Sequence, residues 1–463
     1  MTRAAELLIS LERGNGTPLR VQLEDAVRDA ICTGRLAPGD RVPSSRMLAA
    51  DLGLSRGVVQ ECYAQLVAEG YLTSETGSGT RVAEGAVAVR ERPAPPPAEP
   101  VAPRRMIADF ASGVPDLASA PRTLWASAVQ EVCRTVPNDV FDYGDPQGEP
   151  RLRETLAAYL RRVRATDAGP ERVVVCSGMQ QGLALVLAAA RPRVVACEDP
   201  GAIETVRTAA APAGSEVVPV PVDEHGIDVA ALAASGATAV VVTPAHQWPT
   251  GVVLSPHRRH ELVAWAREHD GLVLEDDYDA EFRYDRDPVG TLQGLAPDRA
   301  VALGTVSKSL MPALRLGWAV VPEWLLADVA AAKRMADRGS PVLDQHALAL
   351  LVESGRYDRH LRRMRKEYSR RRDALVEALA EHAPAVRVSG LAAGFHAAAH
   401  LPEGTDVPAL VEEAAARGVR LYPMSRYRSA DGPGAPDLVF GFGNTPERAI
   451  RAGIGAVADL LSP

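Results

Sequence analysis

The stretch Gly304–Trp318 reads GTVSKSLMPALRLGW and contains Lys308, one of only three lysines in a chain of 463 residues. It continues an apolar run, RAVALGT (Arg299–Thr305), of the kind that forms buried β-strands. Lys308 is therefore predicted just beyond a strand end, where open parallel sheets bind their ligands. Because nearly all other positive charge in the chain is on arginine, we interpret Lys308 as functional rather than as an ordinary surface lysine.

Similar apolar runs precede this stretch and alternate with Ala- and Leu-rich helical segments. They are VVVCS (Val173–Ser177), RVVACE (Arg193–Glu198), EVVPV (Glu216–Val220), AVVVTP (Ala239–Pro244) and GLVLED (Gly271–Asp276). This alternation predicts an α/β fold with a mostly parallel sheet covered on both faces. From about Pro322 the pattern becomes helical, and a smaller α/β portion is expected around Ala385–Leu461.

Polar groups at three of the predicted strand ends are expected to meet at one edge of the sheet. Ser177–Gln180 (SGMQ) begins a helix, whose N-terminal amides suit a phosphate. Near Lys308, hydroxyls and a guanidinium would complete a phosphate site: Thr305, Ser307 and Arg315. A lysine beside a phosphate site and an aspartate, Asp276, at another strand end are the groups that a pyridoxal phosphate site requires. Lys308 would form the Schiff base, Asp276 would keep the pyridine nitrogen protonated, and Tyr278 would donate to the ring hydroxyl.

Two patterns could indicate a metal site, but more weakly than the residues around Lys308 indicate pyridoxal phosphate. The acidic cluster Glu275–Glu281 has several carboxylates, but one strand end cannot turn all of them inward. HRRH (His257–His260) lacks further ligand candidates nearby and is more typical of a solvated helix start. We therefore predict no metal site.

The first 82 residues have the punctuation of a helix-turn-helix. In Pro43–Leu72, Ser44 or Ser45 can cap one helix, Gly53 ends it, and Ser55 can cap a second helix running to about Glu69. The predicted seam is Leu48, Leu52, Val59, Leu66 and Val67. YLTSETGSGTRV (Tyr71–Val82) then predicts two short strands around a Gly/Ser tip, a wing. The alternative is a generic three-helix bundle with solvated arginines, and the wing favours DNA binding.

Charge must be concentrated on one face of this segment if it binds DNA. Its nine Lys and Arg residues are matched by ten acidic residues, so affinity would depend on Arg41, Arg46, Arg56 and Arg81. The formal charge of the whole chain, −8, argues against indiscriminate nucleic-acid coating.

Ala83–Arg105 contains six prolines and is predicted to be a linker, able to reach about 70 Å if extended. Five scattered cysteines without CxxC spacing favour a reducing compartment. No apolar run approaches the roughly 20 residues of a membrane span, so a cytoplasmic protein without membrane contact is expected.

Residues 17–82 resemble the GntR-type winged helix. In that family the matching positions contact DNA: Arg46, Ser55, Arg56, Gln60 and Gly79. Residues 107–460 resemble a fold-type I aminotransferase through FDYGDPQGEPRLRETLAAYL (Phe141–Leu160), HQWPTG (His246–Gly251), EDDYDAEFRYD (Glu275–Asp285) and GTVSKSLMPALRLGW. Together these resemble the MocR-type transcriptional regulators.

The resemblance implies a winged-helix DNA-binding domain at 1–82, a linker at 83–105 and a pyridoxal-phosphate-binding effector domain at 106–463. It further implies a head-to-tail homodimer on double-stranded operator DNA with two half-sites. The cofactor residues carried over are Lys308, Asp276, Tyr278, the phosphate ligands Thr305, Ser307 and Arg315, the phosphate-binding turn Gly178, Met179 and Gln180, and Tyr143 for the partner's phosphate.

Three departures from the aminotransferase pattern bear on function. Ala202 replaces a common stacking tyrosine, with Glu204 where some members place a substrate-facing arginine. Trp248 replaces the asparagine that bonds the ring hydroxyl, so that Tyr278 would need help from His246 or Gln247. Val439 in DLVFGFGN (Asp437–Asn444) replaces the arginine that grips the substrate carboxylate, a loss on the order of several kcal/mol. The candidate substitutes are Arg420, Arg426 and Arg428.

We therefore predict a transcriptional regulator that senses pyridoxal phosphate or a small amine effector, rather than an enzyme. The missing carboxylate anchor favours the cofactor itself as the signal, as in PdxR-type members that govern vitamin B6 synthesis; members that control γ-aminobutyrate or taurine use are the alternative. An active aminotransferase with a DNA-binding appendage is the rival prediction, because a fold alone does not exclude it. A regulator whose sensor domain has lost the cofactor is the third.

Overall fold

The computed structural model describes residues 9–14, 16–75, 79–85, 106–284, 289–429 and 437–462. The chain divides into two compact units, Met1–Ala102 and Pro103–Pro463. Most of the predicted linker, residues 86–105, lies outside the described residues. Among the helices that the structure describes, none combines the length and apolar character needed to cross a bilayer.

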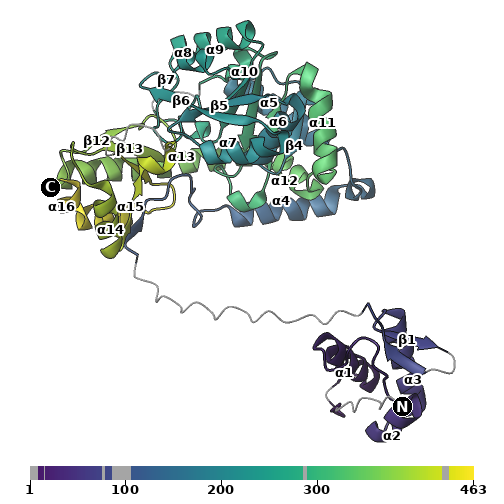
Figure 1. Ribbon diagram of the computed structural model, residues 1–463. Coiled ribbons are helices and arrows are strands. Elements are labelled where there is room, and N and C mark those ends of the chain that lie inside the picture. The colour runs from purple at the N-terminus through teal and green to yellow at the C-terminus, as the bar shows by residue number, and fades with distance from the viewer. Residues whose placement is uncertain are drawn as a thin grey trace. The chain divides into compact units, whose positions relative to one another are not determined.

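The N-terminal unit consists of three helices and a two-stranded wing (Figure 1). Its elements are α1 (Leu19–Cys32), α2 (Ser45–Leu52), α3 (Arg56–Ala68), β1 (Leu72–Glu75) and β2 (Gly79–Val82). The Ser44 hydroxyl accepts from the Met47 amide and the Ser55 hydroxyl from the Val58 amide. Gly53 ends α2 in the left-handed region, at φ 62°. Both predicted caps and the break between the helices are therefore confirmed.

The seam between α2 and α3 differs from the prediction at one position. Leu48, Val59 and Leu66 are buried, but Val67 is 37% exposed. Leu66 and Val67 are consecutive on a helix and point about 100° apart, so only one of them can face the core. The prediction for Val67 was wrong for this reason.

An eight-stranded sheet forms the centre of the larger unit, in the order β4 (Val173–Cys176), β11 (Gly317–Val320), β10 (Ala300–Thr305), β9 (Leu272–Asp277), β8 (Ala239–Val242), β5 (Val194–Asp199), β6 (Glu216–Asp223), β7 (Gly226–Ile227). The run from β10 to β6 is parallel. β11 is antiparallel to both of its neighbours, and β7 is antiparallel to β6. The predicted parallel sheet is thus confirmed, with antiparallel strands added.

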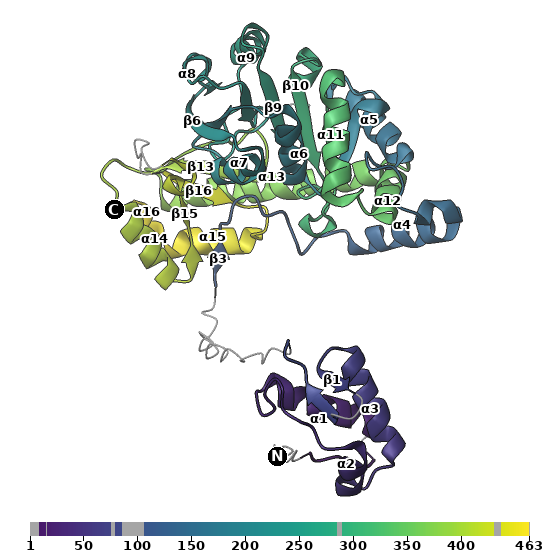
Figure 2. The same cartoon turned by 45° about the vertical axis from the view of Figure 1, so that its right-hand side comes forward.

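Helices cover both faces of this sheet (Figure 2). On β5, Val195 and Cys197 pack with α6 (Met179–Ala190), α7 (Ile203–Ala210) and α11 (Glu323–Asp337). The alternate residues Val194 and Ala196 face the other way, toward α8 (Val229–Ala234) and α9 (Pro256–Glu268). Because successive side chains of a strand point to opposite faces, a strand buried on both faces is apolar throughout. The remaining helices of this part are α4 (Arg122–Thr135), α5 (Pro150–Arg164), α10 (Leu292–Leu295) and α12 (Val342–Glu353).

The long helix α13 (Arg356–His382) leads into the C-terminal portion, a smaller antiparallel sheet with helices. Its strand order is β12 (Arg387–Ser389), β13 (His396–His400), β16 (Asp437–Gly441), β15 (Tyr422–Pro423), with α14 (Val407–Ala416), α15 (Glu447–Ala456) and α16 (Ala458–Leu461). β3 (Ala108–Asp109), near the start of this unit, pairs with β14 (Val419–Arg420). This pairing holds the first described residues of the unit beside its C-terminal portion.

Candidate functional site

The carboxyl ends of β9 and β10 border a cavity of about 410 Å³. Most of the predicted cofactor residues line it: Lys308, Asp276, Tyr278, Thr305, Ser307, Arg315, Met179 and Gln180. Gly178 lies at its edge, as the residue that caps α6. Segments more than 120 residues apart in sequence thus meet at one edge of the sheet, as the strand-end argument predicted.

Lys308 lies in the turn between β10 and β11 and points its amine into the cavity. Its Nζ donates a hydrogen bond to the Gly113 carbonyl at 2.6 Å. Burial lowers the pKa of this amine, while the carboxylates of Asp276 and Asp279 oppose the shift. A lysine in such surroundings loses its proton more readily, and the neutral amine is the nucleophile.

Alternation along β9 separates Asp276 from its acidic neighbours. Asp276 lines the cavity, whereas Glu275 accepts from the Leu292 amide at 2.7 Å, at the start of α10. Asp277 accepts from Arg164 Nε at 2.7 Å. These carboxylates therefore belong to different environments and do not form one metal-binding group.

Asp276 is a buried carboxyl group with one oxygen left unpaired. Its Oδ1 has no hydrogen-bond partner within the described residues. Burial raises the pKa of Asp276 to about 7, and the nearby Lys308 amine acts in the opposite direction. A buried acceptor without a partner is costly. The orphaned oxygen therefore fits a ligand that brings an N–H donor, such as a protonated pyridine ring.

The other end of the cavity is suited to an anion. Gly178 has φ 107°, and a Cβ at this position would lie 3.1 Å from Arg315 Nη2, so glycine lets the guanidinium approach the start of α6. The Arg315 side chain makes no hydrogen bond or ion pair with any described residue, and the Thr305 and Ser307 hydroxyl oxygens lie 2.9 Å apart. Helix amides, hydroxyls and a guanidinium are the donors that phosphate sites use.

Two predicted cofactor residues lie outside the cavity. His246 is buried behind Tyr278, with Nδ1 2.9 Å from Asp279 Oδ2 and Nε2 3.1 Å from the Gly390 carbonyl. Both ring nitrogens have partners outside the cavity, so His246 does not reach into it; its help to Tyr278, whose hydroxyl lies 3.5 Å from Nδ1, stays a prediction. Gln247 is likewise occupied, by Glu198 and by backbone carbonyls.

Tyr143 is the second residue outside the cavity. It is 73% exposed, and the Arg338 guanidinium lies 5.4 Å from its ring centroid. It does not reach the cavity of its own chain, so its role at a partner's phosphate stays a prediction.

The cavity also contains residues that sequence reasoning did not assign to it: Ser112, Gly113, Thr205 and Thr243. Thr243 directly follows β8 and donates to Glu198 Oε2 at 2.6 Å, so the strand-end rule could have found it. Ser112 and Gly113 follow the two-residue strand β3 and carry no local signal. Long-range contacts place them there: the pairing of β3 with β14 and the Gly441 amide, which donates to the Phe110 carbonyl.

Each departure from the aminotransferase pattern changes one wall of the site. Ala202 lines the cavity, so no aromatic ring is supplied from that position, and Glu204 is paired with Arg207. Trp248 lines the cavity and meets the Tyr278 ring edge-on, with centroids 6.1 Å apart.

Val439 lies on β16 in an apolar cluster and is completely buried. Its neighbours are Ala398, Met424 and Tyr427. The predicted substitutes for a carboxylate anchor are elsewhere: none of Arg420, Arg426 and Arg428 lines the cavity. Arg420 pairs with Asp109 at 2.9 Å, and Arg426 lies over the Tyr422 ring.

The predicted DNA-contacting residues lie on α2, α3 and the wing. Arg46, Ser55, Arg56 and Gln60 are exposed. At the wing, Arg41 and Arg81 form a bridge between backbone segments, and Arg81 Nη1 donates to the Gly39 carbonyl at 2.9 Å. Gly79 has φ 85°, and a Cβ there would lie 2.9 Å from Arg41 Nη2. Glycine at this position therefore allows the Arg41 side chain to lie along the wing.

Family models match both units of the chain. The bacterial regulatory proteins of the gntR family match residues 19–82, and aminotransferase class I and II matches residues 105–426. The predicted winged helix and fold-type I domain are thus confirmed. The HRRH segment begins α9, where His257 is exposed, as expected for a solvated helix start.

Two curated relatives extend over nearly the whole chain. The HTH-type pyridoxine biosynthesis transcriptional regulator PdxR of Corynebacterium glutamicum is 34% identical over 99% of both chains. The probable rhizopine catabolism regulatory protein MocR of Rhizobium meliloti is 31% identical over 97% of this chain and 95% of its own. Among solved structures, the multiple substrate aminotransferase of Thermococcus profundus superposes with a TM-score of 0.70 at 26% identity, covering 78% of this chain and 92% of its own.

Proposed function

The chain belongs to the MocR-type regulators of the GntR family, and from that premise we propose that it binds pyridoxal phosphate and uses it to control its hold on operator DNA. One observation carries the proposal. One cavity joins a lysine of lowered pKa, an unpartnered aspartate and a helix start suited to an anion, in a chain that also has a winged helix.

We assign each cavity residue a role from its position. Lys308 supplies the amine and Asp276 accepts from the pyridine nitrogen. Tyr278, predicted as the donor to the ring hydroxyl, lines the cavity and donates its hydroxyl to the His246 carbonyl. Phosphate ligands would be Thr305, Ser307, Arg315 and the Gly178–Gln180 turn. When bound, pyridoxal phosphate supplies an aldehyde that condenses with amines and an electron-withdrawing ring.

Val439 supports a regulator over a working aminotransferase. Its apolar cluster offers no cation to a substrate carboxylate, and the nearby arginines do not line the cavity. Since bidentate pairing with a carboxylate is among the stronger polar contacts in proteins, amino-acid substrates would bind weakly. Steady turnover of an amino acid and a keto acid at ordinary enzyme rates would contradict this assignment.

On the DNA side, we propose a homodimer whose two winged helices read two half-sites, with residues 83–105 connecting each to its effector domain. Tethering raises the local concentration of the second reading head once the first has bound. Tyr143, exposed in the single chain, is available to serve a partner subunit's phosphate. Equal affinity for one isolated half-site and for the pair would contradict this arrangement.

The effector is proposed to be pyridoxal phosphate itself. The name of the Corynebacterium relative, a pyridoxine biosynthesis regulator, and the absent carboxylate anchor both support this choice. The test is titration of the full-length protein on its own promoter DNA with pyridoxal phosphate, and separately with amines. We expect the cofactor alone to change DNA affinity. A change that requires an added amine would replace the cofactor by an amine effector.

A further inference from the structure

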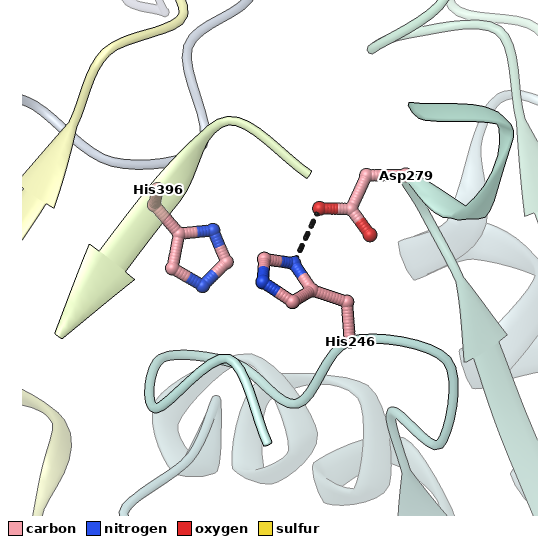
Figure 3. Close-up of side chains that lie close together, drawn as sticks. All are labelled: His246, Asp279 and His396. Carbon is pink, nitrogen blue, oxygen red and sulfur yellow. Dashed lines mark hydrogen bonds and ion pairs between the residues drawn. The ribbon is translucent and has the colours of Figure 1, made fainter. Parts of the chain in front are cut away.

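His246, Asp279 and His396 form a buried cluster (Figure 3). It lies directly behind the side of the cavity formed by Tyr278 and Trp248, whose rings both contact the His396 ring. His246 follows β8, Asp279 follows β9, and His396 is the first residue of β13 in the C-terminal portion. The two imidazole rings face one another with centroids 4.3 Å apart. The cluster therefore joins the large sheet to the C-terminal portion.

The two contacts of His246 are incompatible with a neutral ring beside an ionised Asp279. Nδ1 lies 2.9 Å from Asp279 Oδ2, and Nε2 lies 3.1 Å from the Gly390 carbonyl oxygen. Both oxygens are acceptors when Asp279 is ionised, whereas a neutral imidazole has only one N–H. One nitrogen would then direct its lone pair at an oxygen in a water-free interior.

We propose that His246 is held as a buried imidazolium that donates to Asp279 and to Gly390, and that it is a positioning residue for the wall formed by Tyr278 and Trp248. The doubly protonated ring satisfies both contacts at once. It also makes the buried Asp279 carboxylate one half of an ion pair.

A metal ion is the other cation that these residues suggest, since their ligand atoms lie within 4.8 Å of one another. The geometry favours the proton. The Nδ1–Oδ2 separation of 2.9 Å is a hydrogen-bond length, whereas two ligands of a tetrahedral zinc ion lie about 3.3 Å apart. His396 is packed as a neutral ring: burial first, and the adjacent His246 second, hold its pKa well below the usual value.

Contacts on two sides of His246 show which parts of the chain the imidazolium would hold in place. On the cavity side, the Tyr278 hydroxyl donates to the His246 carbonyl at 2.8 Å. On the other side, a Cβ on Gly394 would lie 2.3 Å from both His246 Nδ1 and Asp279 Oδ2, so the backbone at Gly394 rests directly on the pair. Gly390 and His396 complete this cover. The pair thus clips the segment Gly390–His396 to the residues behind the cavity.

Several charged or titratable groups face the His246–Asp279 pair from the elements packed against it. Asp279, Tyr278 and His396 face His246 directly. Beyond them, Asp277 and Lys308 act on the Asp279 carboxyl, whose pKa is raised chiefly by burial and lowered by His246. Asp279→Asn isolates the role of charge. The asparagine amide can donate to an unprotonated Nδ1 while Nε2–H still donates to Gly390, so a neutral ring then satisfies both contacts.

The first experiment reads the ring nitrogens of the ten histidines by ¹⁵N NMR of the full-length protein at pH 8, without cofactor. Free histidine at the same pH gives the reference signal of a neutral ring. We expect two protonated nitrogens on His246 in the natural chain and one in Asp279→Asn. A single protonated nitrogen in the natural chain would overturn the proposal, as would about one zinc ion per chain that survives dialysis.

The second experiment rests on the proposed function and measures pyridoxal phosphate affinity against pH from the visible absorption band. We expect Asp279→Asn to weaken binding about tenfold and to change the pH profile, and His246→Gln to weaken it at least as much. His257→Gln, on the exposed start of α9, is the matched control. Unchanged affinity and profile in Asp279→Asn would overturn the positioning role. The NMR result needs no cofactor, so failure of the cofactor assignment is distinguishable from failure of the charge assignment.

Discussion

The surface of the N-terminal unit that we propose faces DNA and the cavity of the larger unit use charge in opposite ways. On the first, Arg46 and Arg56 are exposed on neighbouring helices. In the second, Asp276 is buried and Lys308 is partly buried beside it, and burial lowers the pKa of the amine and raises that of the carboxyl. Exposed charges act through water and salt, whereas buried charges act on one another through a medium of low polarity.

This difference predicts how each region responds to substitution. DNA affinity should be a sum of similar, salt-dependent contributions, so that losing one arginine weakens binding without abolishing it. The cavity should behave as a unit, because its groups are arranged around one ligand and each sets the protonation of the next. Substitutions in the cavity are therefore expected to have the larger effects.

The largest effect is expected for Lys308→Ala. Without the amine, pyridoxal phosphate has no covalent attachment in the cavity, and the visible absorption band of the bound cofactor should disappear. The exposed Lys366 gives a matched control, since Lys366→Ala removes a lysine outside the cavity. A band of unchanged position and strength in Lys308→Ala would contradict the assignment of the lysine.

Asp276→Asn should change how the stability of the cofactor-free protein depends on pH. The pKa of Asp276 is raised to about 7 in the folded chain from 3.8, so between these values the folded state binds a proton that the unfolded state has lost. Stability therefore falls as pH rises through that window, by on the order of 4 kcal/mol for a carboxyl group buried this completely. In Asp276→Asn this contribution is absent.

The measurement is urea unfolding of the larger unit at pH 5 and pH 8, comparing the two proteins. Asp328→Asn, at an exposed position on α11, is the control. Glu275 also has a pKa raised to about 7, so some decrease with pH remains in every variant, and the difference between variants is the informative quantity. If the free energy of unfolding decreased equally in Asp276→Asn and in the natural chain, Asp276 would not be the carboxyl group whose raised pKa causes the decrease.

The same contrast explains which features could be predicted from sequence. Ser44, Gly53 and Ser55 act within four residues of their own position, so helix ends in the N-terminal unit could be predicted from local chemistry. Val67 could not, because its exposure depends on which face of α3 meets α1 and α2. Local rules assign a helix but leave its rotation to packing.

In the cavity, the strand-end rule placed Asp276 and Lys308 correctly at one sheet edge, since parallel strands end together. It did not find Ser112 and Gly113, whose position depends on the pairing of β3 with β14 more than 300 residues later. The comparison with the aminotransferase pattern, in turn, placed His246 near the ring hydroxyl of the cofactor. A residue beyond a strand end can face the cavity or the layer behind it, and only the position of Gly390 decides that here.

Arg56→Ala tests the exposed half of the comparison and should have an intermediate effect. Removing one arginine from the start of α3 is expected to weaken operator binding by about 1–3 kcal/mol if it reads a base. If it contacts only phosphate, the slope of log affinity against log salt should decrease by about 1. Arg35→Ala, which removes an exposed arginine paired with Asp29 after α1, is the control. A loss of the visible cofactor band in Arg56→Ala would contradict a role of Arg56 that is confined to contact with DNA.

The smallest effect is expected for Ser55→Ala. The Ser55 hydroxyl accepts from the Val58 amide at the start of α3, and losing such a cap typically costs about 1 kcal/mol. Because Ser55 is exposed and is also a predicted DNA contact, Ser55→Asp separates the two roles. Aspartate caps a helix as well as serine but places a negative charge toward phosphate.

We expect the alanine variant to lower the unfolding midpoint of the N-terminal unit and the aspartate variant to preserve it while weakening DNA binding. If alanine and aspartate lowered DNA affinity and stability equally, Ser55 would act only through the fold of α3. The contributions of the exposed residues to DNA affinity would then not be separate and additive, as the comparison requires.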